Sequence, residues 1–222
     1  EELWAVIQEP CEFENHLLTV SASIGVATYP ENGDTVDAII QSADSAMYQS
    51  KHSGKGRVIF FNHQMREAIS RNIAVEREMH DALKLGELSL AFQPQYEIQT
   101  RRLLGFEALM RWTSPVLGPV SPEEFIPKAE FNGLIHRWGH WAMVEACQQF
   151  MQLRSKLPPF AYLSINLSAM QLQAPGFLEE VQRVLHDTGM PTAALQFEIT
   201  ESVLISDPDL TIRVMRQLNA LG

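Results

Sequence analysis

Two glutamates and one asparagine are the residues of this sequence best suited to metal chemistry. Glu107, Asn166 and Glu198 each lie late in a segment whose alternation of apolar and polar residues predicts a β-strand. Carboxylate and amide oxygens are hard ligands of the kind that Mg²⁺ and Mn²⁺ prefer. No cluster of cysteines or histidines favours zinc instead. The three residues therefore predict a hard-metal site, provided that the fold brings the three strand ends together.

The three strands share one pattern of faces. Period-two alternation places Glu107, Asn166 and Glu198 each on the polar face of its own strand. The opposite face of each strand is apolar, with Leu104, Phe106, Ala108 and Met110 in the first, Leu163, Ile165 and Leu167 in the second, and Leu195, Phe197 and Ile199 in the third. If the strands are parallel neighbours in a barrel, the apolar faces pack on helices and the polar faces converge at the carboxyl-end mouth, where barrel active sites lie. The alternative is that each polar residue ends its own strand and caps or pairs locally.

Three further polar residues flank this set. Arg111 could bind a phosphate through its forked guanidinium, although an arginine at a strand end is often only a solvated charge or half of an ion pair. Gln93 could contact the edge of a nucleobase, and a glutamine bonded to backbone is an equal alternative. Glu201 falls on the opposite parity from Glu198, so we expect it to do a different job.

The segments after Gly86 alternate between the two kinds of secondary structure. We predict strands at Leu88–Ile98, Leu103–Arg111, Ala161–Leu167 and Leu195–Thr200, and helices at Glu123–Phe131, Arg137–Ser155, Phe177–Asp187 and Asp209–Leu221. Because parallel strands need crossover connections, this alternation predicts an α/β fold, either a barrel or a doubly wound sheet.

The first part of the chain has the pattern of a smaller α/β piece. We predict a strand over Leu17–Tyr29, a helix capped by Asp34, and a strand over Arg57–Phe61, a set too small to close its own core. The amphipathic stretch from Gln64 to Leu85 is a predicted connecting helix. A further alternative is that this helix pairs with its twin in a homodimer.

Bulk properties narrow the function classes. The 222 residues are 45% hydrophobic and 20% charged, which is ordinary globular composition, and contain no apolar run long enough to cross a membrane. The formal charge of −10 argues against binding to a nucleic-acid polymer, but it leaves room for a small phosphate-bearing ligand. Cys11 and Cys147 are far apart and lack metal-ligand spacing, which favours a reducing, cytoplasmic location over a disulfide scaffold.

A series of motifs after residue 86 closely resembles the EAL phosphodiesterase family. Glu107-Ala108-Leu109 followed by Met110-Arg111-Trp112 matches the naming motif, and Phe92-Gln93-Pro94, Ile126-Pro127-Lys128-Ala129-Glu130, Asn166-Leu167-Ser168 and Glu198-Ile199-Thr200-Glu201-Ser202 follow in the family's order. The resemblance implies a modified eight-stranded α/β barrel, similar to a TIM barrel. It also implies hydrolysis of cyclic di-GMP to linear pGpG with two divalent cations, Mg²⁺ or Mn²⁺.

The resemblance also implies roles for individual residues. Glu107, Asn166 and Glu198 would be the metal ligands and so the catalytic set, Leu109 and Arg111 would contact the substrate, Gln93 would lie near a guanine, and Glu201 would anchor a loop. The remaining ligands are expected beyond Gly222, so we expect this piece alone to be inactive and poorly soluble. The alternatives are a degenerate receptor that binds cyclic di-GMP without cutting it, and a diguanylate cyclase acting through an upstream domain.

The first sixty residues resemble the end of a GGDEF domain. Ser23-Ile24-Gly25-Val26-Ala27 and Ala43-Asp44-Ser45-Ala46-Met47-Tyr48 carry this likeness, and the GGDEF signature itself is not among the 222 residues. We therefore expect the carboxyl-terminal part of a GGDEF domain over 1–62, a connecting helix over 63–85, and the amino-terminal half of an EAL domain over 86–222.

Overall fold

The computed structural model describes residues 4, 6–7, 10–14, 16–52, 54, 56–199 and 207–222. Its backbone forms two compact units, Glu1–Val75 and Glu76–Gly222. The helix α3 (His63–Ala82) runs across the boundary between them. None of the helices in the described part of the chain combines the length and the hydropathy needed to cross a membrane. Cys11 and Cys147 are both free thiols.

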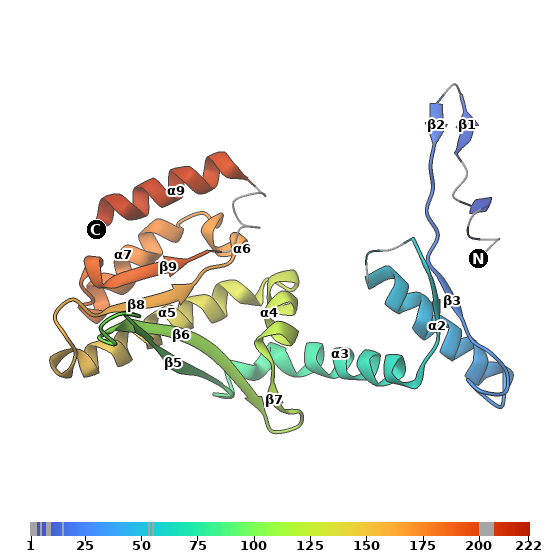
Figure 1. Ribbon diagram of the computed structural model, residues 1–222, viewed down its shortest axis with the longest axis horizontal. Helices are drawn as coiled ribbons and strands as arrows, with labels where there is room; N and C mark the ends of the chain where they lie inside the picture. The colour runs from blue at the N-terminus through green and yellow to red at the C-terminus, as the bar shows by residue number, and fades with distance from the viewer. Residues whose placement is uncertain are drawn as a thin grey trace. The chain divides into compact units, whose positions relative to one another are not determined.

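Among its described residues, the first unit (Figure 1) contains β1 (Cys11–Phe13), β2 (His16–Leu18), β3 (Ile24–Val26), α2 (Val36–His52), β4 (Val58–Phe60) and the larger part of α3. These strands form two small sheets. The strands β1 and β2 form an antiparallel pair, and β3 and β4 form a parallel pair. Gly25 lets β3 lie close to α2, because a Cβ atom there would be 1.9 Å from the carbonyl oxygen of Ala43.

Two predictions for this unit were wrong in detail. The single strand predicted over Leu17–Tyr29 is divided into β2 and β3, because its two ends pair with different partners, β1 and β4. A strand is stabilised by its ladder, so a run of suitable residues without one continuous partner does not form one continuous strand. The predicted cap Asp34 is replaced by its neighbour Thr35, whose Oγ1 accepts a hydrogen bond of 3.2 Å from the backbone N–H of Ala38.

The second unit is a mixed sheet with helices. Its strands are β5 (Leu88–Tyr96), β6 (Leu103–Ser114), β7 (Gly118–Val120), β8 (Tyr162–Asn166) and β9 (Leu195–Glu198). Its helices are α4 (Pro122–Phe131), α5 (Leu134–Leu153), α6 (Ala169–Leu172), α7 (Phe177–Thr188) and α9 (Pro208–Leu221), with 3-10 turns at Arg154–Lys156 and Thr192–Ala194. The strand order is β5-β6-β8-β9, and β7 pairs with β6. The strands β6, β8 and β9 are parallel, whereas β5 runs antiparallel to β6.

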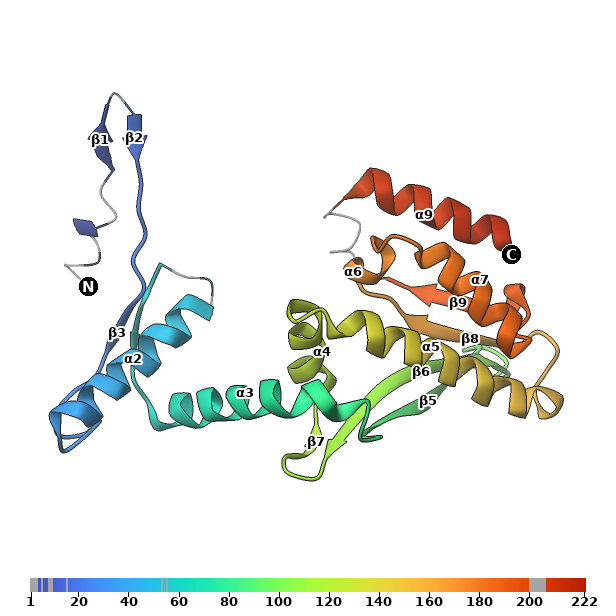
Figure 2. The same cartoon turned by 180° about the vertical axis from the view of Figure 1, so that it is seen from behind.

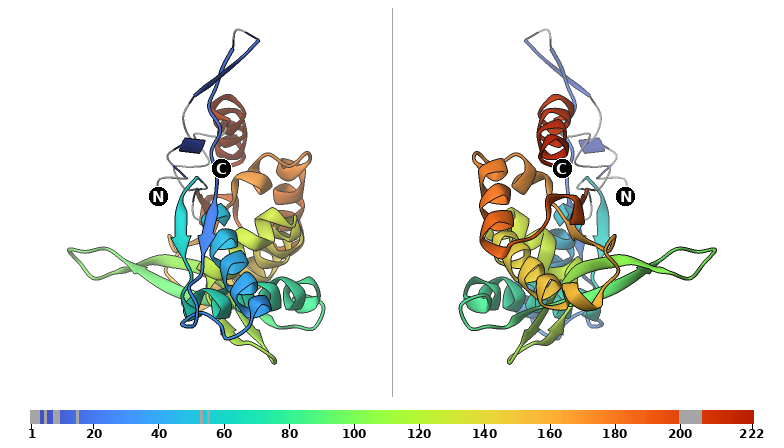
Figure 3. Two further views of the ribbon diagram at one scale, coloured as in Figure 1. Left: turned by 90° about the vertical axis from the view of Figure 1, so that its right-hand side faces the viewer. Right: turned by 90° about the vertical axis from the view of Figure 1, so that its left-hand side faces the viewer.

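The helices α5 and α7 pack together on the apolar face of this sheet. Figures 1 and 2 show both helices on the same side of the strands, and Figure 3 shows them next to each other in yellow and orange. The core between them includes Ala108 from β6, Leu163 and Ile165 from β8, and Phe150 and Val181 from the helices. The apolar parity predicted for β6 and β8 therefore does face the helices.

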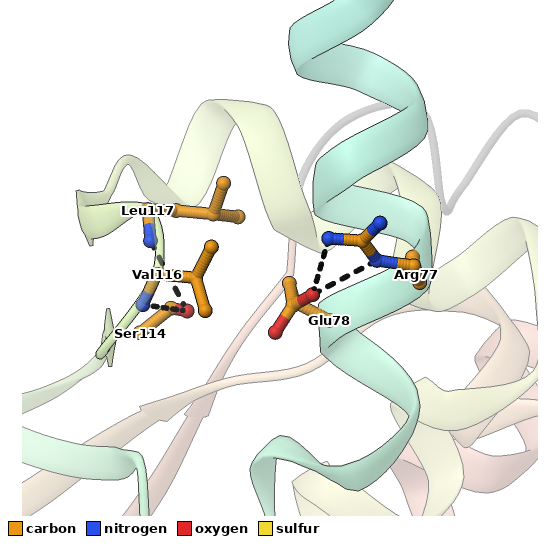
Figure 4. A network of polar contacts seen from close by, with 5 residues as sticks. All are labelled: Arg77, Glu78, Ser114, Val116 and Leu117. Carbon is orange, nitrogen blue, oxygen red and sulfur yellow. Dashed lines mark hydrogen bonds and ion pairs between the residues drawn. The ribbon is translucent and has the colours of Figure 1, made fainter.

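The strand β6 extends past the predicted end at Arg111 because it continues into a hairpin with β7. Ser114 Oγ closes this turn by accepting hydrogen bonds from the backbone N–H groups of Val116 at 3.2 Å and Leu117 at 3.3 Å (Figure 4). The same view shows Arg77 and Glu78 on α3 joined at 2.9 Å, an exposed pair that contributes little to stability.

The predicted fold class is confirmed as α/β with part of a TIM-like barrel. All four strands and all four helices predicted after Gly86 are present. The prediction missed β7 and α6, which are three and four residues long and too short to show a period.

Candidate functional site

The neighbouring strands β6, β8 and β9 bring the three predicted metal ligands together, with Glu107 inside β6 rather than at its end. Asn166 and Glu198 are the last residues of β8 and β9, and they lie opposite each other in the parallel register. Glu107 lies on β6 opposite Ser164, which is two residues before Asn166. Residues two apart on a strand point to the same face, so Glu107 and Asn166 share the polar side of the sheet.

Glu107 and Asn166 are in direct contact. The side-chain Nδ2 of Asn166 donates a hydrogen bond of 2.6 Å to Oε1 of Glu107, across 59 residues of sequence. This bond uses only one carboxylate oxygen and the amide nitrogen. The second oxygen of Glu107 and Oδ1 of Asn166 are therefore the atoms of this pair that suit a cation.

Glu198 is held from the far edge of the same sheet. Its Oε1 accepts a hydrogen bond of 3.4 Å from Nε2 of Gln95, which lies on β5. β5 and β9 are the first and last strands in the sheet order, with β6 and β8 between them. A contact between their side chains requires the sheet to curve around its polar face, as the wall of a barrel does. Sequence reasoning missed Gln95, although it has the same parity as Gln93.

A cavity of about 470 Å³ opens beside these strand ends. Four of the predicted site residues line it, namely Leu109, Arg111, Asn166 and Glu198. Apolar side chains make up much of the remaining wall, including Met110, Pro122, Ile126, Ile135 and Met170. A cavity with a largely apolar wall and a few polar groups is typical of small-molecule binding sites.

Arg111 lines this cavity. Its Nη1 donates a hydrogen bond of 2.9 Å to the carbonyl oxygen of Met110, the preceding residue. The cavity wall also contains Glu130, Ser168 and Gln171, which were not predicted as site residues. Glu130 could have been found, since it lies in a stretch that carries the family resemblance.

Two of the other predicted residues, Gln93 and Glu107, do not line the cavity. Gln93 is exposed on β5 and lies opposite Glu107 in the antiparallel register. Glu107 contacts Asn166 but does not itself line the cavity. Glu201 lies outside the described residues, so its predicted role as a loop anchor stays a prediction.

The donor set fits a divalent cation in its chemistry. Glu107, Asn166 and Glu198 offer only carboxylate and amide oxygens, the ligands of Mg²⁺ and Mn²⁺. Within residues 4–199 and 207–222, apart from the few gaps given above, no three His, Cys, Asp or Glu side chains cluster closely enough to hold a metal ion by themselves. A site built on these strand ends therefore depends on the amide of Asn166 and on ligands from elsewhere.

A buried serine, Ser164, lies near this set. The Oγ atom of Ser164 is buried and makes no hydrogen bond within the described part of the chain. Ser164 lies between Glu107 on β6 and Gln196 on β9 in the register. Because buried hydroxyls are usually hydrogen-bonded, the Ser164 hydroxyl is an exception that calls for a test.

The comparisons with known proteins agree with this geometry. The model of the EAL domain family matches residues 76–222, and the model of the diguanylate cyclase GGDEF domain matches residues 1–57. Biofilm architecture maintenance protein MbaA of Vibrio cholerae is 35% identical over 91% of this chain and 25% of its own length. The bifunctional diguanylate cyclase/cyclic di-GMP phosphodiesterase MucR of Pseudomonas aeruginosa is 32% identical over 100% of this chain and 32% of its own length.

A solved structure shows the same fold. PaMucR phosphodiesterase, in a complex with c-di-GMP, superposes with a TM-score of 0.64 at 32% identity, covering 67% of this chain and 60% of that one. This chain thus spans about a quarter to a third of the length of the two curated relatives. The predicted order, a GGDEF part followed by an EAL part, is confirmed. The chain belongs to the EAL domain family, with a GGDEF domain match preceding the EAL part.

Proposed function

We propose that the EAL part of this chain forms one half of the active site of a phosphodiesterase that hydrolyses cyclic di-GMP to linear pGpG. The observation that carries the proposal is the hydrogen bond between Asn166 and Glu107, with Glu198 in register beside Asn166. Asn166 and Glu198 end the parallel strands β8 and β9, at the edge of the sheet where α/β barrels carry their active sites, and Asn166 contacts Glu107 of β6.

Glu107, Asn166 and Glu198 are proposed to hold Mg²⁺ or Mn²⁺. When bound, such ions lower the pKa of a water molecule, orient it for attack and offset the charge that develops on the phosphate. The protein's part is to hold the three side chains in place. Gln95 holds Glu198 and Asn166 holds Glu107, each by one hydrogen bond on the polar face of the sheet.

The cavity supports the proposed substrate class. Its apolar wall suits the face of a guanine, and Arg111, which lines the cavity, is proposed to bind a phosphate oxygen through its guanidinium. Leu109 lines the same cavity and is proposed to contact the substrate. Gln93 near a guanine and Glu201 as a loop anchor remain proposals based on the family resemblance.

The test is hydrolysis of cyclic di-GMP by the full-length protein with Mg²⁺ or Mn²⁺ present. We expect Glu107→Gln to lower kcat by at least about 100-fold, because a group that stabilises transition-state charge contributes on that scale. The matched control is Glu179→Gln, at an exposed glutamate on α7, which should leave turnover unchanged. Equal turnover in the two variants would contradict the proposal. Tight binding of the dinucleotide without turnover would instead favour a receptor.

We also propose a homodimer and a cytoplasmic location. The dimer proposal is supported by Ile73 of α3, a large apolar side chain that is 61% exposed. The location is supported by the two separate, unpaired cysteines. Light scattering of the full-length protein and of its Ile73→Glu variant tests the first proposal, and loss of the dimer in the variant is the expected result.

A further inference from the structure

The chain turns sharply behind Asn166, and a short helix closes this turn. Ser168 caps α6, and its Oγ accepts a hydrogen bond of 3.3 Å from the backbone N–H of Gln171. In return, Oε1 of Gln171 accepts a hydrogen bond of 3.3 Å from the backbone N–H of Ser168. This reciprocal arrangement is a capping box, which satisfies two backbone donors that the helix cannot pair itself.

Gln171 is locked against the neighbouring helix as well. Its side chain is only 8% exposed, which is unusual for a glutamine. It lies directly over Gly139 of α5, where a Cβ atom would be 1.8 Å from Nε2 and 2.7 Å from Cδ of Gln171. The absence of a side chain at residue 139 thus creates the space that the Gln171 amide fills.

The turn connects two of the proposed metal ligands. The backbone N–H of Leu167, the residue after Asn166, donates a hydrogen bond of 2.8 Å to the carbonyl oxygen of Glu198. The backbone N–H of the next residue, Ser168, is the one bonded by Gln171. Two successive amides therefore fix the backbone between β8 and α6, one to the end of β9 and one to a side chain seated on α5.

We propose that Gln171 is a positioning residue for the metal site. Its side chain fills the space above Gly139 and acts on Asn166 through the backbone N–H of Ser168. The inference rests on the proposed function, since it assigns Asn166 to the metal. Gln171 also lines the cavity, but in this role it acts through its hydrogen bond with the Ser168 N–H and not by contact with the metal. It holds the carboxyl end of β8, so that Oδ1 of Asn166 keeps its place beside Glu107.

The physical argument concerns where the strand ends. Asn166 is the last residue of β8, so the ladder to β9 supports it on one side only. Without the Gln171 acceptor, the Ser168 N–H would be left unpaired and the turn could adopt other conformations. Residues that orient metal ligands from outside the ligand set contribute about 10–100-fold to metal affinity or activity.

The first test compares two substitutions of Gln171 in the full-length protein, with Mn²⁺ affinity measured by electron paramagnetic resonance. Gln171→Met keeps the length of the side chain but removes the acceptor, and we expect Mn²⁺ affinity to fall about 10-fold. Gln171→Glu keeps an acceptor oxygen for the Ser168 N–H and completes an equally good capping box, so it should restore affinity to within about 2-fold. The matched control is Gln182→Met, at an exposed glutamine on α7.

A second test changes Gly139, the other partner in the contact with Gln171. Gly139→Ala removes no hydrogen-bonding atom, yet its Cβ would displace the Gln171 amide, so we expect the same loss of about 10-fold. In a Gln171→Ala background the space is empty, and adding Gly139→Ala should then change Mn²⁺ affinity by less than about 2-fold. This non-additivity is specific to the contact between residues 139 and 171.

The outcomes separate this inference from the function that it rests on. If Asn166→Ala lowers Mn²⁺ affinity while Gln171→Met and Gly139→Ala bind Mn²⁺ like the unmodified protein, the positioning role is overturned and the proposed function stands. If Asn166→Ala leaves Mn²⁺ affinity unchanged, the metal assignment itself is wrong and the inference is overturned with it. Loss of affinity in Gln171→Glu equal to that in Gln171→Met would also overturn the role of the acceptor. Should Gln171→Met fail to fold, Gly139→Ala gives the deciding measurement.

Discussion

The two units of the chain bury their apolar side chains to different extents. Among the described residues of Glu1–Val75, the buried apolar residues are Ala46, Phe61 and Val75, while Tyr29 and Val36 are more than 70% exposed. In Glu76–Gly222 the faces of α5 and α7 enclose a continuous core on the sheet. The difference follows from the lengths of the elements, because strands of three residues cannot present an extended apolar face.

The second unit therefore provides the rigid support for a site, and the first does not. The proposed ligands project from strands whose opposite faces lie in the core, as Leu163 and Ile165 do on β8. The first unit depends more on individual polar contacts, such as those of the buried Ser42. The predictions below test this contrast between a packed unit and a unit held by polar contacts.

The largest effect is expected in the aromatic cluster of the second unit. Phe125 is fully buried and packs edge to face on Trp112 and Trp138, with ring centroids 5.9 and 5.7 Å apart. Phe125→Ala should lower the free energy of unfolding of this unit by about 3–5 kcal/mol, from lost burial and a residual cavity. Hydrogen exchange of peptides from each unit of the full-length protein measures this locally.

The matched substitution in the first unit is Phe60→Ala on β4. Phe60 is 60% exposed, so the change should alter the local stability of its unit by no more than about 0.5 kcal/mol. A loss comparable to that of Phe125→Ala would show that the side chain of Phe60 is covered in the full-length protein.

Ser42 tests the polar contacts of the first unit. Its Oγ donates a hydrogen bond of 2.7 Å to the carbonyl oxygen of Asn32 and accepts one of 2.8 Å from Nη2 of Arg66. Ser42→Ala should cost about 1–3 kcal/mol, because both partners lose a buried hydrogen bond. Ser45→Ala on the same helix is the control, since Ser45 is less buried than Ser42 and its Oγ donates a hydrogen bond of 2.8 Å to the carbonyl oxygen of Gln41, one turn back on the same helix. Equal effects of the two substitutions would contradict the role given to Ser42.

Cys147 gives the second unit a dependence on pH. Burial raises the pKa of its thiol from 9.0 to about 12, and a hydrogen bond with Thr188 opposes this shift weakly. Because the folded pKa is the higher one, the unfolded chain loses this proton first as the pH rises. The contribution is constant below about pH 9, and stability then falls by about 1.4 kcal/mol per pH unit up to about pH 12.

The measurement compares the unmodified protein with Cys147→Ala between pH 8 and pH 10. The stability of the unmodified protein relative to the variant should fall by about 1 kcal/mol over this range. Alkylation offers a second readout, since the exposed Cys11 should react at pH 8 and the buried Cys147 should not. Rapid alkylation of Cys147 in the folded protein would show that the core around α5 opens.

Alternation and length made β6, β8 and β9 predictable from the sequence, and the faces of these strands with them. Direction was not predictable, because a strand such as β5 shows the same alternation whether it runs parallel or antiparallel. The division of β2 from β3 was also hidden, since it depends on partners that lie far away in the sequence. Short-range patterns specify an element, and long-range pairing decides where it ends.

The candidate site shows the same division. Parity placed Glu107, Asn166 and Glu198 on one face, but the contact of Gln95 with Glu198 depends on the curvature of the whole sheet. The spacing Ser-x-x-Gln at Ser168 and Gln171 is a visible capping signal. The packing of Gln171 against Gly139 could not be predicted from the sequence, because the glycine lies about thirty residues earlier on another helix.

The smallest effect is expected at Ser164, the counterpart of Ser42 in the second unit. Both serines are buried, but Oγ of Ser164 has no hydrogen-bond partner within the described part of the chain. Removing an unpaired buried hydroxyl relieves a desolvation cost, so Ser164→Ala should be neutral or stabilise the unit by up to about 1 kcal/mol. A loss of more than about 1 kcal/mol would mean that this hydroxyl is paired in the full-length protein. The strands around Glu107 would then be stabilised by buried polar contacts, as the first unit is. The contrast between a packed unit and a unit held by polar contacts would not hold on the polar face of this sheet.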